Sequence, residues 1–245
     1  MMRDLLKSSL RQFGYDITQH PIPDWYLLRT GLTELFDQLQ INCAIDVGAN
    51  NGQFASFLRQ IGYKGRIVSF EPVSTTFKLL EEKSRNDHDW RVQNLAVGSA
   101  DETLEINITD GSVFNSLLPM NSYGKTQFPK ESVVRRTEKV NVVRLDSIMD
   151  EIVQGLETPR VYLKMDTQGY DLQVLEGAST CLPLILGLQS EIALKPIYEG
   201  MPDYLTSLAK LNDLGFSATS LIPVTRDEKL RIVEFDCLMV RNNLN

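Results

Sequence analysis

The sequence contains few of the residues that build metal sites and disulfide frameworks. Its 245 residues include two histidines and three cysteines, and Cys43, Cys181 and Cys237 lie far apart, each within an apolar run. An odd number of widely spaced cysteines predicts reduced core side chains rather than disulfides, and therefore a reducing, cytoplasmic environment. Because no cluster of histidine and aspartate has the spacing of metal ligands, we expect no metal ion.

The chain also lacks an excess of positive charge and any long apolar segment. It has 25 lysines and arginines against 32 aspartates and glutamates, which gives a net charge of −7. This balance argues against electrostatically driven binding to nucleic acid or to a membrane surface. No run of about 18 apolar residues is present and the N-terminus has no signal-peptide core, so we expect neither a membrane span nor export.

What is present suffices for one substantial α/β core, because 42% of the residues are hydrophobic. Short apolar runs bounded by glycine, proline or polar residues predict strands, and helical spacing predicts helices between them. The strands are expected at residues 43–47, 65–70, 91–97, 102–108, 139–143, 161–165, 184–188, 216–222 and 231–240. A final antiparallel hairpin after parallel strands is typical of the Class I methyltransferase sheet.

The most informative stretch follows the first of these strands. Gly48 permits a tight turn and close approach of a ligand, and Gly52 lets a helix begin against the strand. The start of that helix offers unpaired N–H groups to a carboxylate or phosphate. Asp46, at the end of the strand, can accept hydrogen bonds from an amine or from the amides of the turn. The stretch therefore predicts a site for a nucleoside-containing ligand.

The spacing within this turn separates two classes of ligand. A dinucleotide site requires G-x-G-x-x-G, but Asn50 occupies the position of the middle glycine. The missing glycine argues against NAD or FAD, because a pyrophosphate contacts the backbone there. The observed Asp46-x-Gly48-x-x-x-Gly52 resembles the first motif of S-adenosylmethionine-dependent methyltransferases, which implies that the loop holds the methionine end of that cofactor. An ordinary strand-to-helix turn is the alternative.

Two further segments extend the expected cofactor site. Glu71 follows the second strand, 25 positions after Asp46, and in a doubly wound sheet the two strand ends are neighbours. A carboxylate there can bind both ribose hydroxyls, although a helix cap beside Ser74 is the alternative. An adenine would lie at the end of the third strand, which contains Asn94 and Ala96. Asn94 either contacts the ring or satisfies backbone groups.

The strand at 161–165 leads into a second strand–turn–helix unit. It ends at Asp166, and Gly169 allows the turn that follows, so Asp166 is expected near the reactive end of the cofactor. Glu191 follows the next strand. We expect Asp166 to be the base or orienting carboxylate and Glu191 its electrostatic partner, although both can instead hold loops. Lys164 lies within the strand, where its charge needs a partner.

Two regions outside these motifs, at the N-terminus and in the middle of the chain, carry weaker signals. Residues 1–40 carry a short amphipathic helix at 2–13 and a second one that begins at Asp24 or Thr33 and ends at Leu39. We expect a small N-terminal helical cap at residues 1–40, either a lid or an arm of a homo-oligomer, followed by one domain at 41–245. Residues 110–130 form the longest irregular stretch, within a loop at 109–139 that we expect to help set the acceptor. In it, Ser112, Asn115 and Ser116 are candidates for binding a substrate or cofactor.

Four segments together resemble the FkbM family of S-adenosylmethionine-dependent methyltransferases. They are residues 44–52 (AIDVGANNG), 70–72 (FEP), 143–146 (VRLD) and 163–177 (LKMDTQGYDLQVLEG), the last being the most specific. The resemblance covers residues 41–240. It implies a Rossmann-like, doubly wound, mostly parallel seven-stranded sheet. The matching positions are Asp46, Gly48, Gly52 and Glu71 for the cofactor and Asp166 with Gly169 in the signature loop.

The same resemblance implies transfer of a methyl group from S-adenosylmethionine to a hydroxyl of a sugar, polyketide or other secondary metabolite. The acceptor is then a small molecule or glycan. Many members of the family have glutamate at the positions of Gln168 and Asp171. An uncharged Gln168 cannot be a base or a metal ligand of the carboxylate type. Two other functions stay open, a dinucleotide-dependent oxidoreductase and a catalytically idle cofactor-binding scaffold.

Overall fold

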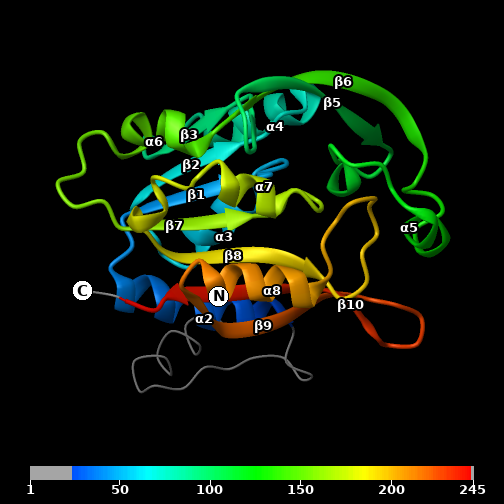
Figure 1. Cartoon of the computed structure of the whole chain (residues 1–245). Helices are drawn as coiled ribbons and strands as arrows, with labels where there is room; N and C mark the ends of the chain where they lie inside the picture. Colours follow the sequence, from blue (N-terminus) through cyan, green and yellow to red (C-terminus); the bar gives the residue numbers. More distant parts are fainter. Residues whose placement is uncertain (1–23, 244–245) are drawn as a thin grey trace, which may run out of the picture.

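A seven-stranded sheet of order β3-β2-β1-β7-β8-β10-β9 forms the centre of the computed structural model, which describes residues 24–243 (Figure 1). Strands β3, β2, β1, β7 and β8 run parallel, whereas β10 is antiparallel to both β8 and β9. This is the expected doubly wound sheet with a C-terminal hairpin. The strands are β1 (Cys43–Val47), β2 (Arg66–Phe70), β3 (Trp90–Gln93), β7 (Val161–Met165), β8 (Ile185–Ala193), β9 (Phe216–Arg226) and β10 (Ile232–Arg241).

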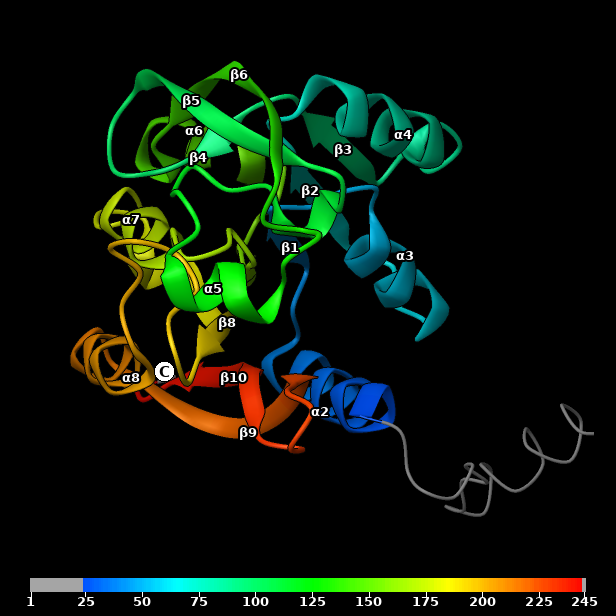
Figure 2. The same ribbon diagram turned by 90° about the vertical axis from the view of Figure 1, so that its right-hand side faces the viewer.

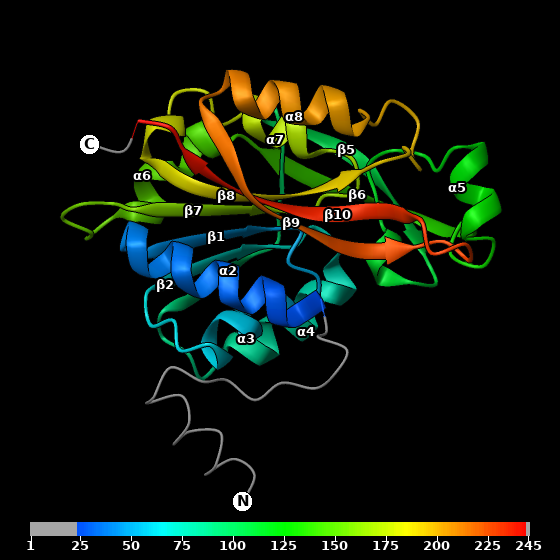
Figure 3. The same cartoon turned by 90° about the horizontal axis from the view of Figure 1, so that it is seen from below.

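Helices cover both faces of this sheet, as Figure 3 shows. One face packs against α2 (Asp24–Leu39), α3 (Gln53–Gln60) and α4 (Ser74–Ser84). The other packs against α6 (Leu145–Val153), α7 (Asp171–Glu176) and α8 (Tyr204–Asp213). Alternate residues of β1 divide between the two cores: Ile45 contributes to the α6–α8 side and Ala44 to the α2–α4 side. The continuous apolar runs in the sequence thus reflect strands that are buried on both faces.

A second, three-stranded sheet of order β4-β6-β5 lies beside the first (Figure 2). Its strands are β4 (Ala96–Val97), β5 (Glu102–Thr109) and β6 (Val134–Val143). The expected single strand at 91–97 is therefore wrong. The Asn94 side chain donates hydrogen bonds of 2.9 Å to the carbonyl oxygens of Glu71 and Pro72, and the chain leaves the main sheet at this point.

The stretch at 109–139 is more ordered than its composition suggests. It contains a 3₁₀ turn, η1 (Ser112–Phe114), and helix α5 (Ser122–Gln127), and β6 begins at Val134. Two residues in the first half of this stretch pair with other segments. Ser116 pairs with Asn107 of β5, and Met120 forms a bridge with Tyr198. Figure 2 shows α5 in front of the strand ends of the main sheet.

Two acids have positions that their local sequence does not reveal. Helix α6 begins after Arg144, and the Asp146 carboxylate accepts hydrogen bonds from the backbone N–H groups of Thr180 and Cys181. The carboxylate therefore holds the loop after α7. Strand β8 continues to Ala193, so Glu191 lies inside the strand rather than after it. All three cysteines are buried and free, as expected.

The N-terminal region is described from residue 24 onward. Helix α2 begins at Asp24, the earlier of the two expected starts, and buries Leu32, Leu35 and Leu39 against the sheet. The expected helix at 2–13 lies outside the described residues, and the division into a cap and a domain stays a prediction. None of the helices in residues 24–243 is long and apolar enough to cross a membrane.

Candidate active site

A cavity of about 470 Å³ lies at the carboxyl ends of the central strands. It opens where β1 and β7 are adjacent, the point at which the strand order reverses, and ligands bind at such points in doubly wound sheets. The segment that carries η1 forms part of its wall, with Ser112 and Ser116 among the lining residues. Its volume is in the range of small-molecule sites.

The glycine turn after β1 is shaped by its neighbours. Gly48 has φ +76°, and a Cβ atom there would collide with the carbonyl oxygen of Asp166. Gly52 has φ +80°, and a Cβ atom there would lie 2.8 Å from the Trp90 ring. Each position therefore requires glycine for both its backbone conformation and its space. Gly48 and Asn50 line the cavity, whereas Gly52 only packs α3 against the sheet.

Glu71 is held by the backbone at the cavity wall. Its two carboxylate oxygens accept hydrogen bonds of 2.9 Å from the N–H groups of Asn50 and Val73. The residue is 6% exposed, and burial raises its pKa to about 7 although the two N–H groups act in the opposite direction. Each oxygen keeps a free lone pair. Glu71 can therefore accept two further hydroxyl donors, as a ribose would provide.

Of the two residues expected beside the adenine, Ala96 lines the cavity and Asn94 does not. Ala96 lines the cavity together with Leu95 and Val97 and offers an apolar surface. Asn94 does not line it, and its amide is engaged with the backbone after β2. Asn94 thus fixes the loop that carries Glu71.

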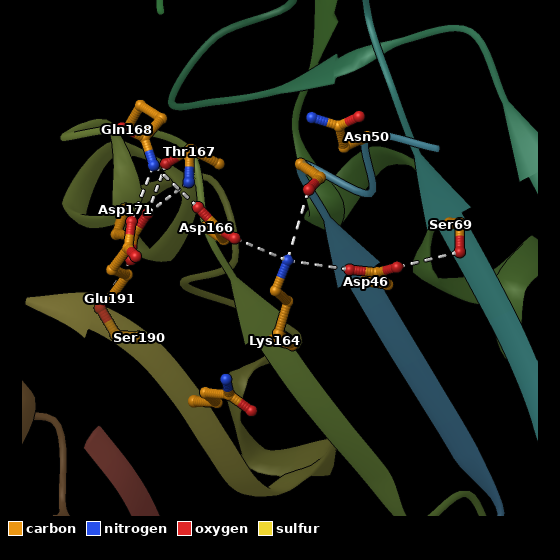
Figure 4. A network of polar contacts seen from close by, with 12 residues as sticks. Asp46, Asn50, Ser69, Lys164, Asp166, Thr167, Gln168, Asp171, Ser190 and Glu191 are labelled. Atoms are coloured by element: carbon orange, nitrogen blue, oxygen red, sulfur yellow. Dashed lines mark hydrogen bonds and ion pairs between the residues drawn. The ribbon is translucent and has the colours of Figure 1, made fainter. Parts of the chain in front are cut away.

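Asp46, Lys164 and Asp166 form a chain of charges across β1 and β7 (Figure 4). The Lys164 ammonium lies 3.2 Å from Asp46 Oδ1 and 3.3 Å from Asp166 Oδ2. Asp46 is fully buried and also accepts a hydrogen bond from the Ser69 hydroxyl. Burial lowers the pKa of Lys164, but the two carboxylates outweigh it and raise the pKa above its ordinary value. Asp46 therefore positions Lys164 rather than lining the cavity.

Gln168 joins the two expected catalytic carboxyls. Its Nε2 donates to Asp166 Oδ1 at 3.1 Å and to Glu191 Oε2 at 2.7 Å (Figure 4). Its Oε1 accepts the hydroxyl of Tyr198 at 2.9 Å. An amide supplies both donors and the acceptor, which a carboxylate cannot do. Gln168 adopts φ +53°, a left-handed conformation that aims its side chain at this position.

The two carboxyls differ in protonation. Burial raises the pKa of Asp166, but the Lys164 ammonium and the hydrogen bond from Gln168 outweigh it and hold the pKa below its ordinary value. For Glu191, burial and the nearby Asp166 charge raise the pKa well above its ordinary value. These directions favour the ionised form of Asp166, whose side chain is 38% exposed, and the protonated form of Glu191. Asp166 has the charge that a general base needs.

Several lining residues escaped the sequence analysis. Glu234 and Asp236 line the cavity from β10, and Tyr198, which follows β8, contacts Gln168 from behind the cavity wall. Sequence reasoning interpreted β10 only as a strand. The available signal was the pair of acids at positions 234 and 236, which share one face of a strand that is otherwise apolar. Within residues 24–243, no group of three or more His, Cys, Asp or Glu side chains is arranged to hold a metal ion.

Solved structures with related folds include several methyltransferases. One is fibrillarin from Aeropyrum pernix with natively bound S-adenosyl-L-methionine, which is 12% identical with a TM-score of 0.46 over 81% of this chain and 66% of that chain. Another is an rRNA methylase from Streptococcus thermophilus, which is 10% identical with a TM-score of 0.47 over 92% of this chain and 100% of that chain. A third is magnesium protoporphyrin IX methyltransferase from Synechocystis PCC 6803 with bound S-adenosylmethionine, which is 12% identical with a TM-score of 0.46 over 98% of this chain and 95% of that chain. At these identities and TM-scores, none of the three identifies the acceptor of this chain.

Comparison of the sequence with protein-family models identifies the family of the chain. No curated protein matches the chain. A model of the methyltransferase FkbM domain matches residues 46–217, more than half of the chain, from the buried Asp46 through the turn at Asp166 to the start of β9. The chain therefore belongs to the FkbM family of S-adenosylmethionine-dependent methyltransferases, as its motifs predicted.

Proposed function

We propose that this methyltransferase transfers the methyl group to a hydroxyl oxygen of a small molecule or glycan. The observation that carries the proposal is the Asp166 carboxylate, which lies at the switch point with Lys164 on one side and Gln168 on the other. An alcohol is a poor nucleophile until its proton is removed. A carboxylate that is kept ionised at the cavity is suited to that step.

The cavity residues fit S-adenosylmethionine. Glu71 has lone pairs for the ribose hydroxyls, the apolar residues around Ala96 suit an adenine ring, and the turn at Gly48 approaches the methionine end. These residues are the proposed cofactor contacts, with Asn50 beside them. Asp46, Gly52 and Asn94 do not line the cavity, and each positions a residue or segment that does. Bound S-adenosylmethionine supplies an electrophilic methyl carbon on its sulfonium.

The chain's own residues then have three tasks. The cavity walls align the acceptor oxygen with the methyl carbon, and this orientation accounts for much of the rate enhancement in such reactions. Asp166 takes the hydroxyl proton as the oxygen–carbon bond forms. Gln168 fixes Asp166 and Glu191 relative to each other, so that the ionised carboxylate faces the acceptor.

The N-terminal segment is proposed to contribute to the acceptor side. Leu28 of α2 lines the cavity, so the helix before β1 already forms part of the wall. This placement supports the expected cap function of residues 1–40. The acidic lining of the cavity also favours a small acceptor over a nucleic acid, whose phosphates the carboxylates would repel.

The test is a calorimetric titration with S-adenosylhomocysteine, followed by a screen for methyl consumption over hydroxylated acceptors. Binding followed by O-methylated product supports the proposal. Binding of the cofactor with no turnover of any acceptor would indicate a catalytically idle scaffold. Binding of NAD without S-adenosylhomocysteine would indicate an oxidoreductase instead. Product analysis by mass spectrometry and NMR distinguishes oxygen from nitrogen as the methylated atom.

A further inference from the structure

The cavity has a second end, which the cofactor contacts do not use. In the sheet order, β2 lies on one side of the β1–β7 pair, and β8 and β10 lie on the other. Glu71 follows β2, whereas Glu191 belongs to β8 and Glu234 and Asp236 to β10, and all four line the cavity. Asp236 is paired with Glu191 in the antiparallel register, so the two side chains share one face of the sheet.

These three carboxyls at the β8–β10 end lack a cationic partner. In the part of the chain that the structure describes, Lys164 pairs with Asp46 and Asp166, and no ion pair includes Glu191, Glu234 or Asp236. Acidic side chains are rarely buried without such compensation. Glu191 favours its protonated form, so Glu234 and Asp236 are the two acids whose charge a cationic ligand group would compensate.

Glu234 gives a second, independent indication. It is 5% exposed and lines the cavity, and among the described residues its Oε1 has no hydrogen-bond partner. A buried polar atom without a partner is costly, and native structures keep few of them. The oxygen is shielded in the ligand-free chain, and a ligand's donor group would satisfy it once the Glu234 carboxyl turned toward the cavity.

The cavity also has apolar and partly aromatic walls, and the centroid of the Phe54 ring lies 5.8 Å from the Lys164 ammonium. Phe54 and Phe57 of α3, Leu28 of α2 and Val224 of β9 line the cavity together with the carboxyls. Aromatic rings beside carboxylates are the combination that recognises an organic ammonium group. A metal ion would need at least three arranged ligands, and no such group is present within residues 24–243. The chemistry of this end therefore favours an organic cation.

We propose that the β8–β10 end of the cavity binds a protonated amine on the methyl acceptor, which makes the acceptor an amine-bearing hydroxyl compound. This inference rests on the proposed O-methyltransferase function. The ammonium nitrogen has no lone pair and is a handle, not the nucleophile. The hydroxyl oxygen at the Asp166 end forms the bond to the methyl carbon, the sulfur–methyl bond breaks, and the hydroxyl proton passes to Asp166.

The raised pKa values of Glu234 and Asp236 agree with the binding of an ammonium group beside them. Burial raises the pKa of Glu234 to about 7 and that of Asp236 to about 6, and the charge of Asp166 adds to both shifts. Asp166 acts on both acids, and Lys164 and Asp171 act on Asp236, where the Lys164 ammonium lowers the pKa. Glu191 lies opposite Asp236 in β8, and Tyr198 interacts with Glu234 and Glu191. A bound ammonium would relieve both the burial of the charges and their mutual repulsion.

The test compares matched pairs of probes that differ in one group. Tyramine and its alcohol analogue tyrosol, and glucosamine and glucose, are titrated by calorimetry into the full chain saturated with S-adenosylhomocysteine, and also into the free protein. The amine of at least one pair is expected to bind about tenfold or more tightly than its neutral partner. Equal affinities within both pairs, or no binding of either amine up to its solubility, would overturn the proposal.

Variants of Glu234 and Asp236 test whether the preference for amines arises at the β8–β10 end of the cavity. Glu234→Gln and Asp236→Asn keep the shape of the side chain and remove its charge, so each is expected to cut the amine preference several-fold without changing the affinity for S-adenosylhomocysteine. Glu228→Gln, in the exposed turn between β9 and β10, makes the same change of net charge and should leave the preference intact. An unchanged preference in both site variants contradicts the proposal.

The two proposals fail separately. If S-adenosylhomocysteine does not bind the wild-type chain, the proposed function fails, whatever the amines do. If it binds and the amine preference is absent, only the ammonium site fails.

Discussion

The Gln168 side-chain nitrogen lies 2.7 Å from Glu191 Oε2 and connects the β7 turn to strand β8. Because the same nitrogen also donates to Asp166, two acids share one neutral donor group. Burial raises the pKa of both acids, but the Lys164 ammonium and the Gln168 donor hold that of Asp166 below its ordinary value, whereas the Asp166 charge raises that of Glu191 further. The resulting difference between the two acids is the basis of the predictions on catalysis.

Replacing Gln168 by glutamate should change the pH dependence of activity. Gln168→Glu removes the donor that lowers the pKa of Asp166 and adds a like charge beside it. The pKa of Asp166 therefore rises, and the acidic limb of the kcat/KM profile should move up by about one pH unit or more. The control is Gln154→Glu, an exposed position after α6. An unmoved limb in Gln168→Glu would refute the role given to Gln168.

Removing the proposed base should separate turnover from cofactor binding. In Asp166→Asn and Asp166→Ala, kcat is expected to fall by about 10²- to 10⁴-fold, which is the usual contribution of a general base. The affinity for S-adenosylhomocysteine, measured by calorimetry, should change by less than about threefold because Glu71 and the Gly48 turn are untouched. A parallel loss of affinity would place Asp166 among the cofactor contacts.

Substitution of Glu71 should weaken cofactor binding and leave kcat nearly unchanged, the reverse of the result expected for Asp166. Glu71→Gln is expected to weaken S-adenosylhomocysteine binding by about 10- to 100-fold, because it replaces a charged acceptor of two hydroxyl groups. At saturating cofactor, kcat should stay within about threefold of the wild type. The matched control is Glu82→Gln on the exposed side of α4. A variant that binds normally would remove Glu71 from the site.

The pKa of Glu71, about 7, adds a pH dependence to the same measurement. Below that pH the wild-type carboxyl is protonated and loses part of its acceptor capacity, so the affinity for S-adenosylhomocysteine should fall as the pH is lowered from 8 to 6. Glu71→Gln should show a flatter dependence over this range. If wild type and variant give the same dependence, another group titrates.

The stability of the ligand-free protein should reflect the buried acids at the β8–β10 end. The pKa of Glu234 is raised from its ordinary value near 4.5 to about 7, so the folded state binds more protons than the unfolded state between these values. Its contribution to stability therefore decreases as the pH rises through this window and stays low above it. Glu234→Gln should accordingly stabilise the protein at pH 8 by ~2 kcal/mol and have little effect at pH 4.5.

Urea unfolding at the two pH values measures this difference, with Glu228→Gln as the control for net charge. Comparing variant with wild type cancels the contributions of other acids, such as Asp146, whose pKa is lowered and whose effect has the opposite sign. A stabilisation that is equal at both pH values would show that packing, not titration, is responsible.

Local patterns predicted the parts of the site that lie on consecutive residues. The turn from Asp46 to Gly52 and the position of Glu71 could be found because a strand end, a glycine spacing and a parallel sheet together fix them. The placement of Asp166 beside β1 followed from the same topology, and the register pairs Met165 with Val47. The need of Lys164 for a partner was anticipated because a buried ammonium requires one, but its partners, Asp46 and Asp166, were identified only by the structure.

The rest of the site depends on contacts between distant segments. Gln168 and Glu191 are 23 positions apart, and Tyr198 reaches Gln168 from 30 positions away. The acids of β10 enter the site only through the antiparallel register of β8 and β10, which no local pattern encodes. The extension of β6 to Val134 was missed for another reason: its first residues are exposed on both faces, so hydrophobic alternation is absent.

The account depends most on where the cofactor binds, and a crystal structure with S-adenosylhomocysteine tests this directly. We predict that the ribose hydroxyls lie within hydrogen-bond distance of the Glu71 carboxylate, with the adenine beside Ala96 and the sulfur facing Asp166. A nucleoside bound elsewhere on the chain, or with its ribose away from Glu71, would contradict the account.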